Sequence, residues 1–200
     1  SVEALHGVSL DIAAGGFVVL QGPSGSGKTT LLNLIGCIDS PTSGKVFLGG
    51  TDTSELGDDA LSAFRAKRLG FVFQNFNLIP VLTALENIEY PLLLQRVGKA
   101  EARARAGAML DAVGLGGMDR QRPGELSGGQ CQRVAIGRAL VGNPSLVVAD
   151  EPTANLDAAT GRSVIDLMHR MRDRTGTTFV IATHDPAVAA SGTPTSANQR

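Results

Sequence analysis

The 200-residue chain contains no tryptophan, one tyrosine and two cysteines. Cys37 and Cys131 lie far apart and in no metal-ligand spacing, which argues against a disulfide scaffold or a cysteine zinc site and indicates a reducing, cytosolic environment. Long apolar runs are also missing, since the stretch 146–149 is far shorter than the roughly 18 residues that indicate a membrane span. The opening residues do not have the pattern of a signal peptide. We therefore expect a chain that does not cross a membrane.

An excess of charge of either sign is missing as well. The sequence has 18 basic and 19 acidic residues, for a formal net charge of −1. Proteins whose main partner is nucleic acid usually carry a strong basic excess or a basic stripe. We therefore expect no nucleic-acid partner. The length suits one domain, or one domain with an inserted lobe, and is enough to bury a core.

Residues 17–35 have the pattern of a strand, a glycine-rich loop and a helix. The loop fits G-x-x-x-x-G-K-[ST], the spacing of a P-loop. Its glycines let backbone N–H groups turn toward phosphate oxygens, Lys28 reaches the β- and γ-phosphates, and the Thr29 hydroxyl can bind Mg²⁺. A mobile Gly/Ser turn is the alternative, but the flanking strand and helix are the context that a P-loop requires. The expected phosphate-binding residues are Gly22, Pro23, Ser24, Gly25, Ser26, Gly27, Lys28, Thr29 and Thr30.

Strands alternate with helices along most of the chain, which predicts an α/β fold with a parallel, doubly wound sheet. The predicted strands include 69–73, 146–150 and 177–183, and the predicted helices include 58–68 and 158–174. From about 75 to 117 an apolar loop and helix and then an alanine-rich helix indicate an inserted helical lobe. The small, polar segment 187–200 is expected to be disordered.

Two acidic residues follow one buried apolar strand. Asp150 ends this strand, where its carboxylate can hold Mg²⁺, and the adjacent Glu151 can orient and deprotonate a water molecule. An ordinary acidic pair at a strand end is the alternative. The P-loop in the same chain favours a Walker B element, the acidic strand end that accompanies a P-loop.

Residues 127–129, Ser-Gly-Gly, open a predicted helix and form a second place suited to an anion. A hydroxyl, bare backbone N–H groups and the helix dipole meet there. Helix capping by Ser127 explains the same residues equally well, so both interpretations stay open.

In their order along the chain, these motifs resemble those of the ATP-binding cassette (ABC) ATPases over residues 2 to 190. They are the P-loop at 22–29, Gln74 after a strand, LSGGQ at 126–130, VVADE at 147–151, NLD at 155–157 and THD at 183–185. The resemblance implies a P-loop NTPase core with a parallel sheet, an antiparallel β subdomain on the N-terminal side and an inserted helical subdomain. A single domain would span 1–190, with 1–74 and 142–186 as the nucleotide-binding core and 75–141 as the helical lobe.

The resemblance also implies ATP and Mg²⁺ as cofactors and a homodimer that sandwiches the nucleotide. Thr29, Gln74 and Asp150 would surround Mg²⁺, Glu151 would be the general base, and His184 would contact the γ-phosphate and steady Glu151. Gln74, Glu151 and His184 would thus form the catalytic set, and Asp157 would touch the opposing subunit. His6 and His169 match no motif and are expected at the surface. The signature residues that would contact ATP from the opposing subunit are Leu126, Ser127, Gly128, Gly129 and Gln130.

Within the family, segments 69–94 and 147–157 look most like ATPases of the macrolide-export and lipoprotein-release kind. This implies a peripheral subunit at the cytoplasmic face of a membrane, which hydrolyses ATP to drive export or extraction through a separate or fused integral membrane partner. The apolar stretch 76–94 would receive a coupling helix of that partner, although most of its side chains are expected in the core of the lobe. The alternatives are a regulatory, cell-division type ABC ATPase, a soluble ABC protein acting on DNA or ribosomes, and an incomplete, inactive cassette.

Three features depart from the family pattern. No aromatic residue precedes Phe17 to stack on adenine, and the residues after His184 do not continue with the usual strands, so both ends look trimmed or diverged. Gly137 lies within the signature helix where alanine is more usual, at an expected cost of about 0.5–1 kcal/mol of helix stability.

Overall fold

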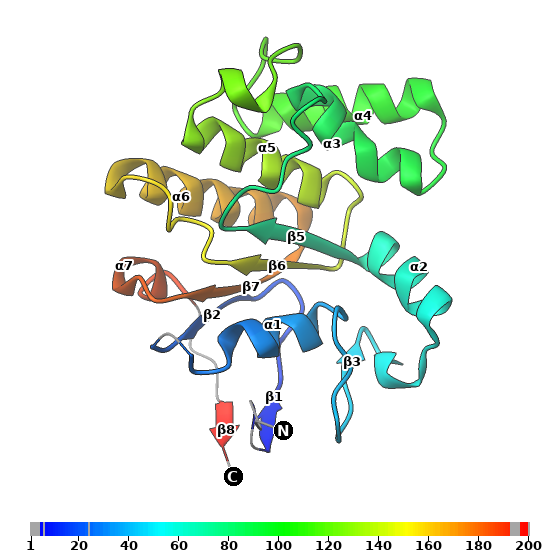
Figure 1. Cartoon of the computed structure of the whole chain (residues 1–200), viewed down its shortest axis with the longest axis vertical. Coiled ribbons are helices and arrows are strands. Elements are labelled where there is room, and N and C mark those ends of the chain that lie inside the picture. Colours follow the sequence, from blue (N-terminus) through cyan, green and yellow to red (C-terminus); the bar gives the residue numbers. More distant parts are fainter. Residues whose placement is uncertain (1–4, 6, 24, 193–196, 200) are drawn as a thin grey trace.

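The computed structural model describes residues 5, 7–23, 25–192 and 197–199. A four-stranded parallel sheet lies at its centre, in the order β2-β7-β6-β5 (Figure 1). Its strands are β2 (Phe17–Gln21), β5 (Leu69–Phe73), β6 (Leu146–Asp150) and β7 (Thr178–Thr183). Because all four strands run in the same direction, their carboxyl ends lie along one edge of the sheet. The predicted strands 69–73 and 146–150 have the same bounds in the structure, and the predicted parallel α/β fold is confirmed.

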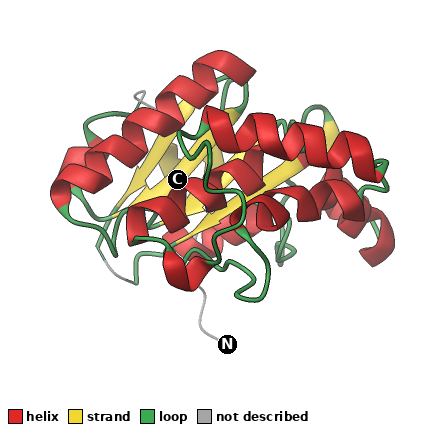
Figure 2. Ribbon diagram, turned by 90° about the horizontal axis from the view of Figure 1, so that it is seen from above, coloured by secondary structure: helices red, strands yellow, loops and turns green. Residues whose placement is uncertain are grey.

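Helices cover both faces of this sheet (Figure 2). Alternate strand residues enter two separate apolar cores, as the period of two in a strand requires. Val18, Val148 and Val180 pack with residues of α1 (Lys28–Ile35) and α2 (Asp58–Arg68). Val72, Val147 and Ile181 pack with residues of α5 (Gly128–Leu140) and α6 (Ala158–Thr175). Burial on both faces explains why these strands are apolar throughout instead of alternating.

The helical lobe consists of α3 (Ala84–Leu94), α4 (Lys99–Ala112) and the signature helix α5 (Figure 1). Thr83 and Glu86 form a capping box at the start of α3, in which each side chain accepts a hydrogen bond from the other's backbone N–H. At Gly137 of α5, an added Cβ would lie 2.9 Å from Cδ1 of Ile88 on α3. The glycine that looked like a cost to helix stability therefore allows α3 and α5 to approach closely.

The lobe and the sheet share one apolar core. Helix α5 lies directly on β5, where an added Cβ at Gly70 would be only 2.3 Å from the carbonyl oxygen of Ala139. Residues of α3, α4, α5 and α6 and alternate residues of the central strands belong to this core. The signature helix is therefore in contact with both the lobe and the strand that leads to Gln74.

Two antiparallel strand pairs lie outside the central sheet. One joins β3 (Phe47–Leu48) to β4 (Thr51–Asp52), and the other joins β1 (Val8–Leu10) to β8 (Ala197–Gln199). The pairing of β8 and the short helix α7 (Pro186–Ala189) differ from the disorder expected for 187–200, because β1 supplies backbone partners that composition alone does not reveal. Residues 193–196 and 200 lie outside the described part. Two short 3₁₀ segments are η1 (Thr53–Glu55) and η2 (Pro123–Glu125).

His169 corrects one sequence-based expectation. Its ring is half-buried and stacks on Phe17, with the ring centroids 3.8 Å apart and the planes inclined by 22°. Helix α6 packs its buried face on the sheet, which brings this histidine over the first residue of β2. His6 lies outside the described residues. Within the described ranges, no helix combines the length and apolar character needed to cross a membrane.

Candidate nucleotide site

The P-loop connects the carboxyl end of β2 to the first turn of α1. Gly25 and Gly27 have φ values of 80° and 82°, a left-handed conformation that glycine adopts without steric cost. The Lys28 ammonium donates hydrogen bonds to the carbonyl oxygens of Gly22 at 2.7 Å and Pro23 at 2.8 Å. The ammonium group therefore lies over the loop itself, close to where phosphate oxygens would be bound. Ser24 is not among the described residues.

Thr29 and Asp150 come together at the same edge of the sheet. The Thr29 hydroxyl donates to Oδ2 of Asp150 over 3.3 Å. Burial raises the pKa of the Asp150 carboxyl and the neighbouring Glu151 charge adds to this, while the Thr29 hydrogen bond and the Lys28 charge oppose it. A carboxylate in such a place is stabilised by a cation.

The donor set at this point fits Mg²⁺. Hydroxyl and carboxylate oxygens are the hard ligands that Mg²⁺ prefers. No group of three or more His, Cys, Asp or Glu side chains that could hold a metal occurs in the described part of the chain. Mg²⁺ commonly takes only one or two protein ligands and completes its coordination with phosphate and water, so a small set of donors is sufficient.

Glu151 adopts a left-handed backbone conformation, with φ of 46°. Its N–H donates to the carbonyl oxygen of Ala182 at 2.9 Å, which fixes this turn against β7. Non-glycine residues in this region cost about 1–3 kcal/mol and cluster at functional sites. Oε1 of Glu151 lies 2.9 Å from Nδ1 of His184, and Oε2 accepts a hydrogen bond from the Thr183 hydroxyl at 3.2 Å. The structure thus brings together the proposed base and the histidine from neighbouring strand ends.

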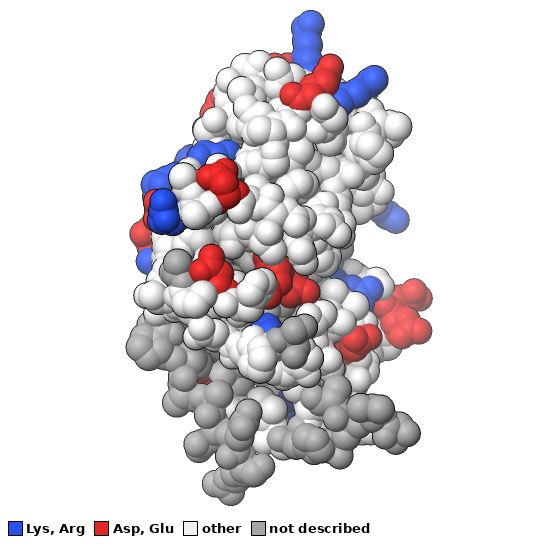
Figure 3. All heavy atoms as spheres, turned by 60° about the vertical axis from the view of Figure 1, so that its left-hand side comes forward, with Lys and Arg blue, Asp and Glu red and all other residues white. Residues whose placement is uncertain are grey.

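Gln74 follows β5 directly. Since Phe73 pairs with Asp150 in the sheet register, Gln74 begins the loop next to the acidic strand end. Its backbone carbonyl accepts a hydrogen bond from Nδ2 of Asn155 at 3.1 Å, and the same nitrogen is 3.0 Å from Oδ1 of Asn75. The three predicted Mg²⁺ ligands therefore come from the ends of three elements that meet at one edge. Figure 3, which brings this edge forward, shows acidic side chains gathered near the middle of the face.

The signature residues form a helix cap. Ser127 Oγ accepts a hydrogen bond from the Gln130 N–H at 3.3 Å, and Gln130 Oε1 accepts one from the Ser127 N–H at 2.8 Å. An added Cβ at Gly129 would lie 2.5 Å from Cγ2 of Thr160, and one at Gly128 would lie 3.3 Å from Leu156. The capping interpretation is therefore realised, and both glycines also serve close packing. Contact with ATP stays a prediction for these residues and for the half-buried Leu126.

Asp157 is the N-cap of α6. Its Oδ1 accepts hydrogen bonds from the N–H groups of Ala159 and Thr160, each at 3.0 Å. The hydrogen bonds at Thr160 lower the pKa of the Asp157 carboxyl below its usual value. Contact with an opposing subunit stays a prediction.

The sequence did not predict that Arg138 and Asn155 hydrogen-bond to the loop after Gln74. Arg138 donates to two carbonyl oxygens of the loop after Gln74, and Asn155 was recognised only as part of the NLD motif. Arg138 is separated from its partners by more than 60 positions, and no local pattern in the sequence indicates this contact.

A family model described as "ABC transporter" matches residues 5–154. The chain belongs to the ABC transporter family. An uncharacterized ABC transporter ATP-binding protein of Thermotoga maritima is 48% identical over 192 residues, which cover 96% of this chain and 82% of that protein. The lipoprotein-releasing system ATP-binding protein LolD of Anaeromyxobacter dehalogenans is 51% identical over 92% of this chain and 78% of its own length. The macrolide export ATP-binding/permease protein MacB of Syntrophobacter fumaroxidans is 50% identical over 94% of this chain, which spans 27% of MacB.

Solved structures agree with these relationships. The dimeric, post-hydrolysis state of the ATP-binding cassette MJ0796, bound to ADP and Pi, has a TM-score of 0.82 and 47% identity, and the match covers 92% of this chain and 81% of that one. A second dimeric structure of MJ0796 has the same TM-score. The expected ABC ATPase fold is confirmed, and the chain is an ATPase of the ATP-binding cassette type.

Proposed function

We propose that the chain drives a membrane transporter and works as a dimer in which ATP is bound between the P-loop of one subunit and the signature segment of the other. The observation that carries this proposal is the position of the two anion sites in the sheet order. The P-loop follows β2 at one end of the order, while the signature helix lies on β5 at the other end. Three strand spacings of about 4.8 Å, or about 14 Å in all, separate β2 from β5. The two sites therefore belong to opposite ends of the strand order, which supports the proposal that the nucleotide at one P-loop meets the signature segment of a second copy.

In the proposed reaction, the P-loop backbone and Lys28 bind the phosphates. Thr29, Gln74 and Asp150 would hold Mg²⁺, which would neutralise phosphate charge. Glu151 orients water and accepts its proton, and His184 holds the Glu151 carboxylate in place and reaches the γ-phosphate. The paired hydrogen bonds of Glu151 with Thr183 and His184 support this division of roles.

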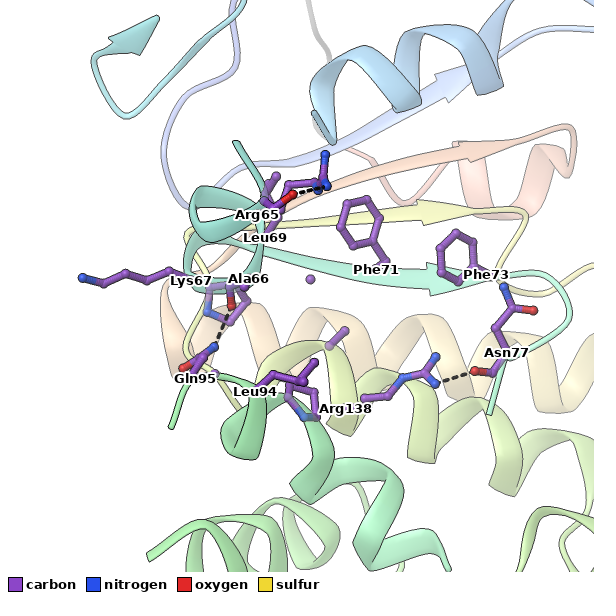
Figure 4. Close-up of a pocket in the computed structure, with 16 residues that line it drawn as sticks. Arg65, Ala66, Lys67, Leu69, Phe71, Phe73, Asn77, Leu94, Gln95 and Arg138 are labelled. Carbon is purple, nitrogen blue, oxygen red and sulfur yellow. Dashed lines mark hydrogen bonds between the residues drawn. The ribbon is translucent and has the colours of Figure 1, made fainter. Parts of the chain in front are cut away.

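A pocket between the core and the helical lobe supports a membrane partner (Figure 4). It has a volume of about 420 Å³ and lies between α2, β5 and the ends of α3 and α5. Leu94 is 61% exposed at its edge, and Val81, Tyr90 and Leu93 are also exposed on the same stretch of chain. The pocket and this stretch of chain thus combine exposed apolar side chains with the basic Arg65 and Lys67. This combination suits a partner helix with apolar and acidic residues. The chain would then lie peripherally at the cytoplasmic face of the membrane.

Trapping of the ATP-bound dimer tests this proposal. Glu151→Gln removes the base while keeping the shape of the side chain, so ATP is bound and not hydrolysed. We expect the variant to sediment as a dimer with ATP and as a monomer with ADP, while the wild type hydrolyses ATP. A wild type without turnover and a variant that stays monomeric at saturating ATP would favour an incomplete, inactive cassette.

The relatives named MacB and LolD favour export of a macrolide-like compound or release of a lipoprotein over a purely regulatory role. Reconstitution with the membrane partner in vesicles distinguishes the two. ATP-driven movement of substrate is expected for a transporter, whereas stimulated ATP hydrolysis without movement of any substrate is expected for a regulatory, cell-division type ATPase.

A further inference from the structure

The loop after Gln74 turns through two consecutive residues in the left-handed region. Phe76 has φ of 60° and Asn77 has φ of 48°. Asparagine tolerates this conformation, but an aromatic residue rarely adopts it. Such a backbone persists only where surrounding contacts hold it. Contacts from outside the loop must therefore hold residues 74–77 in this shape.

Arg138 of the signature helix holds the far end of this loop. Its Nη1 donates to the carbonyl oxygen of Asn77 at 2.5 Å, and its Nη2 donates to that of Phe76 at 2.8 Å. Figure 4 shows the guanidinium pointing along the pocket toward Asn77. The planar fork of arginine holds two adjacent carbonyl groups with two nitrogens in one fixed geometry, whereas the lysine ammonium is a single point charge on a flexible stem.

Asn155 holds the near end of the same loop. Its side-chain amide donates to the carbonyl oxygen of Gln74 and to Oδ1 of Asn75. Asn155 comes from the segment between β6 and α6, four residues after Glu151 in the sequence. The loop is therefore fixed from two directions, by the signature helix and by the segment that follows the acidic pair.

We propose that Arg138 and Asn155 are positioning residues for ATP hydrolysis, which together hold residues 74–77 so that Gln74 stays at the end of β5 beside Asp150. This inference rests on the role of Gln74 in the proposed function. Neither residue needs to touch the nucleotide. Because Arg138 belongs to α5, a displacement of the signature helix displaces the loop with it. Arg138 and Asn77 also line the pocket proposed for the membrane partner, so a bound partner helix contacts this link directly.

Amide hydrogen exchange in the nucleotide-free protein tests the contacts themselves. The loop contains hydrogen-bonded amides whose exchange can be followed, since the N–H of Phe76 donates to the Phe73 carbonyl and the N–H of Asn77 to the Asn75 carbonyl. Arg138→Lys keeps the charge but loses the fork. We expect exchange over residues 74–78 to become about tenfold faster or more in Arg138→Lys and in Asn155→Ala, because hydrogen bonds that close the loop are lost.

Arg133→Lys is the matched control. Arg133 lies on the same helix and also makes two hydrogen bonds, but to the Val113 carbonyl and the Ser163 hydroxyl, away from the loop. Exchange over 74–78 is expected to match the wild type in this variant. Loop exchange in Arg138→Lys and Asn155→Ala equal to that of Arg133→Lys overturns the proposal.

Kinetics then test the consequence. In Arg138→Lys and Asn155→Ala we expect kcat to fall about 10–100-fold, as for other residues that orient a metal ligand. The Kd for ATP without Mg²⁺ is expected to stay within about twofold of the wild-type value. The Mg²⁺ concentration that gives half-maximal turnover is expected to rise, and general loss of stability does not produce this rise.

Faster loop exchange with an unchanged kcat overturns the positioning role and leaves the proposed function intact. A wild type that does not hydrolyse ATP overturns both, even if the exchange results confirm the contacts.

Discussion

The Glu151 carboxylate lies 2.9 Å from Nδ1 of His184, across the ends of two neighbouring parallel strands. With an ionised carboxylate, Nδ1 carries a proton and donates to Glu151, so Nε2 is an acceptor in the neutral ring and a donor only in the doubly protonated ring. The His184 ring is largely exposed whereas Glu151 is mostly covered. Glu151 is therefore the covered member of the pair, and His184 is the exposed member at the carboxyl edge of the sheet.

This pair predicts non-additive kinetics. Glu151→Gln is expected to lower kcat about 10²–10⁴-fold, the usual contribution of a general base. His184→Ala is expected to cost less, about 10–100-fold, because it removes a group that orients the base. Single-turnover rates of the double variant are expected to equal those of Glu151→Gln, since residues that act as a unit do not lose activity additively. If the rate of the double variant falls by the product of the two single-variant losses, the two side chains act independently.

The sequence predicted the central sheet well because its signals are local. Helix 58–68 and strand 69–73 agree residue for residue with α2 and β5. Apolar runs of strand length, separated by turn residues, are sufficient to mark buried parallel strands. The P-loop and the acidic strand end were likewise predicted from local motifs, and the structure brings Thr29 next to Asp150.

The sequence could not reveal contacts that depend on which helix lies on which strand. Gly137 was interpreted as a loss of helix stability, yet it accommodates Ile88. Arg138 and Asn77 are 61 positions apart, and His169 meets Phe17 only because α6 crosses the sheet there. Each of these pairs is set by tertiary packing, for which the sequence has no period or spacing.

Gly70 provides a test of how closely α5 lies on β5. In Gly70→Ala the new methyl group would lie 2.3 Å from the Ala139 carbonyl oxygen, a backbone atom that cannot move alone. We expect the free energy of unfolding to fall by about 1–3 kcal/mol or more, because the helix must shift away from the strand. Denaturant unfolding with a constant m-value measures this change.

Gly107→Ala is its control. Gly107 lies within α4 with nothing close to the position of an added Cβ, so the substitution should stabilise the protein by about 0.5–1 kcal/mol through helix propensity. Equal effects of the two substitutions would contradict the close contact of α5 with β5.

His169 gives the protein a predictable response to acid. Burial lowers the pKa of His169 below its ordinary value of 6.5, with Arg172 adding to the effect and Asp173 and Asp166 opposing it. The unfolded chain therefore takes up a proton first as the pH falls below 6.5, and stability is lost from there down to the lower pKa of the folded state. His169→Phe keeps a ring against Phe17 but cannot be protonated. We expect the fall in Tm between pH 7.5 and 5.5 to be smaller in this variant, and an identical fall would contradict the assignment.

Ser127 allows capping to be separated from contact with ATP. Aspartate and asparagine cap a helix about as well as serine, and a negative charge is favourable at a helix N-terminus. Ser127→Asp and Ser127→Asn should therefore both keep the Tm of the protein with Ser127.

If this cap also faces the γ-phosphate of ATP held by a second subunit, the added carboxylate repels that phosphate and the neutral amide does not. In the Glu151→Gln background, sedimentation with ATP should then show dimers for Ser127→Asn and monomers for Ser127→Asp. Equal dimer formation by both variants would mean that the signature segment serves its own helix and does not reach the nucleotide.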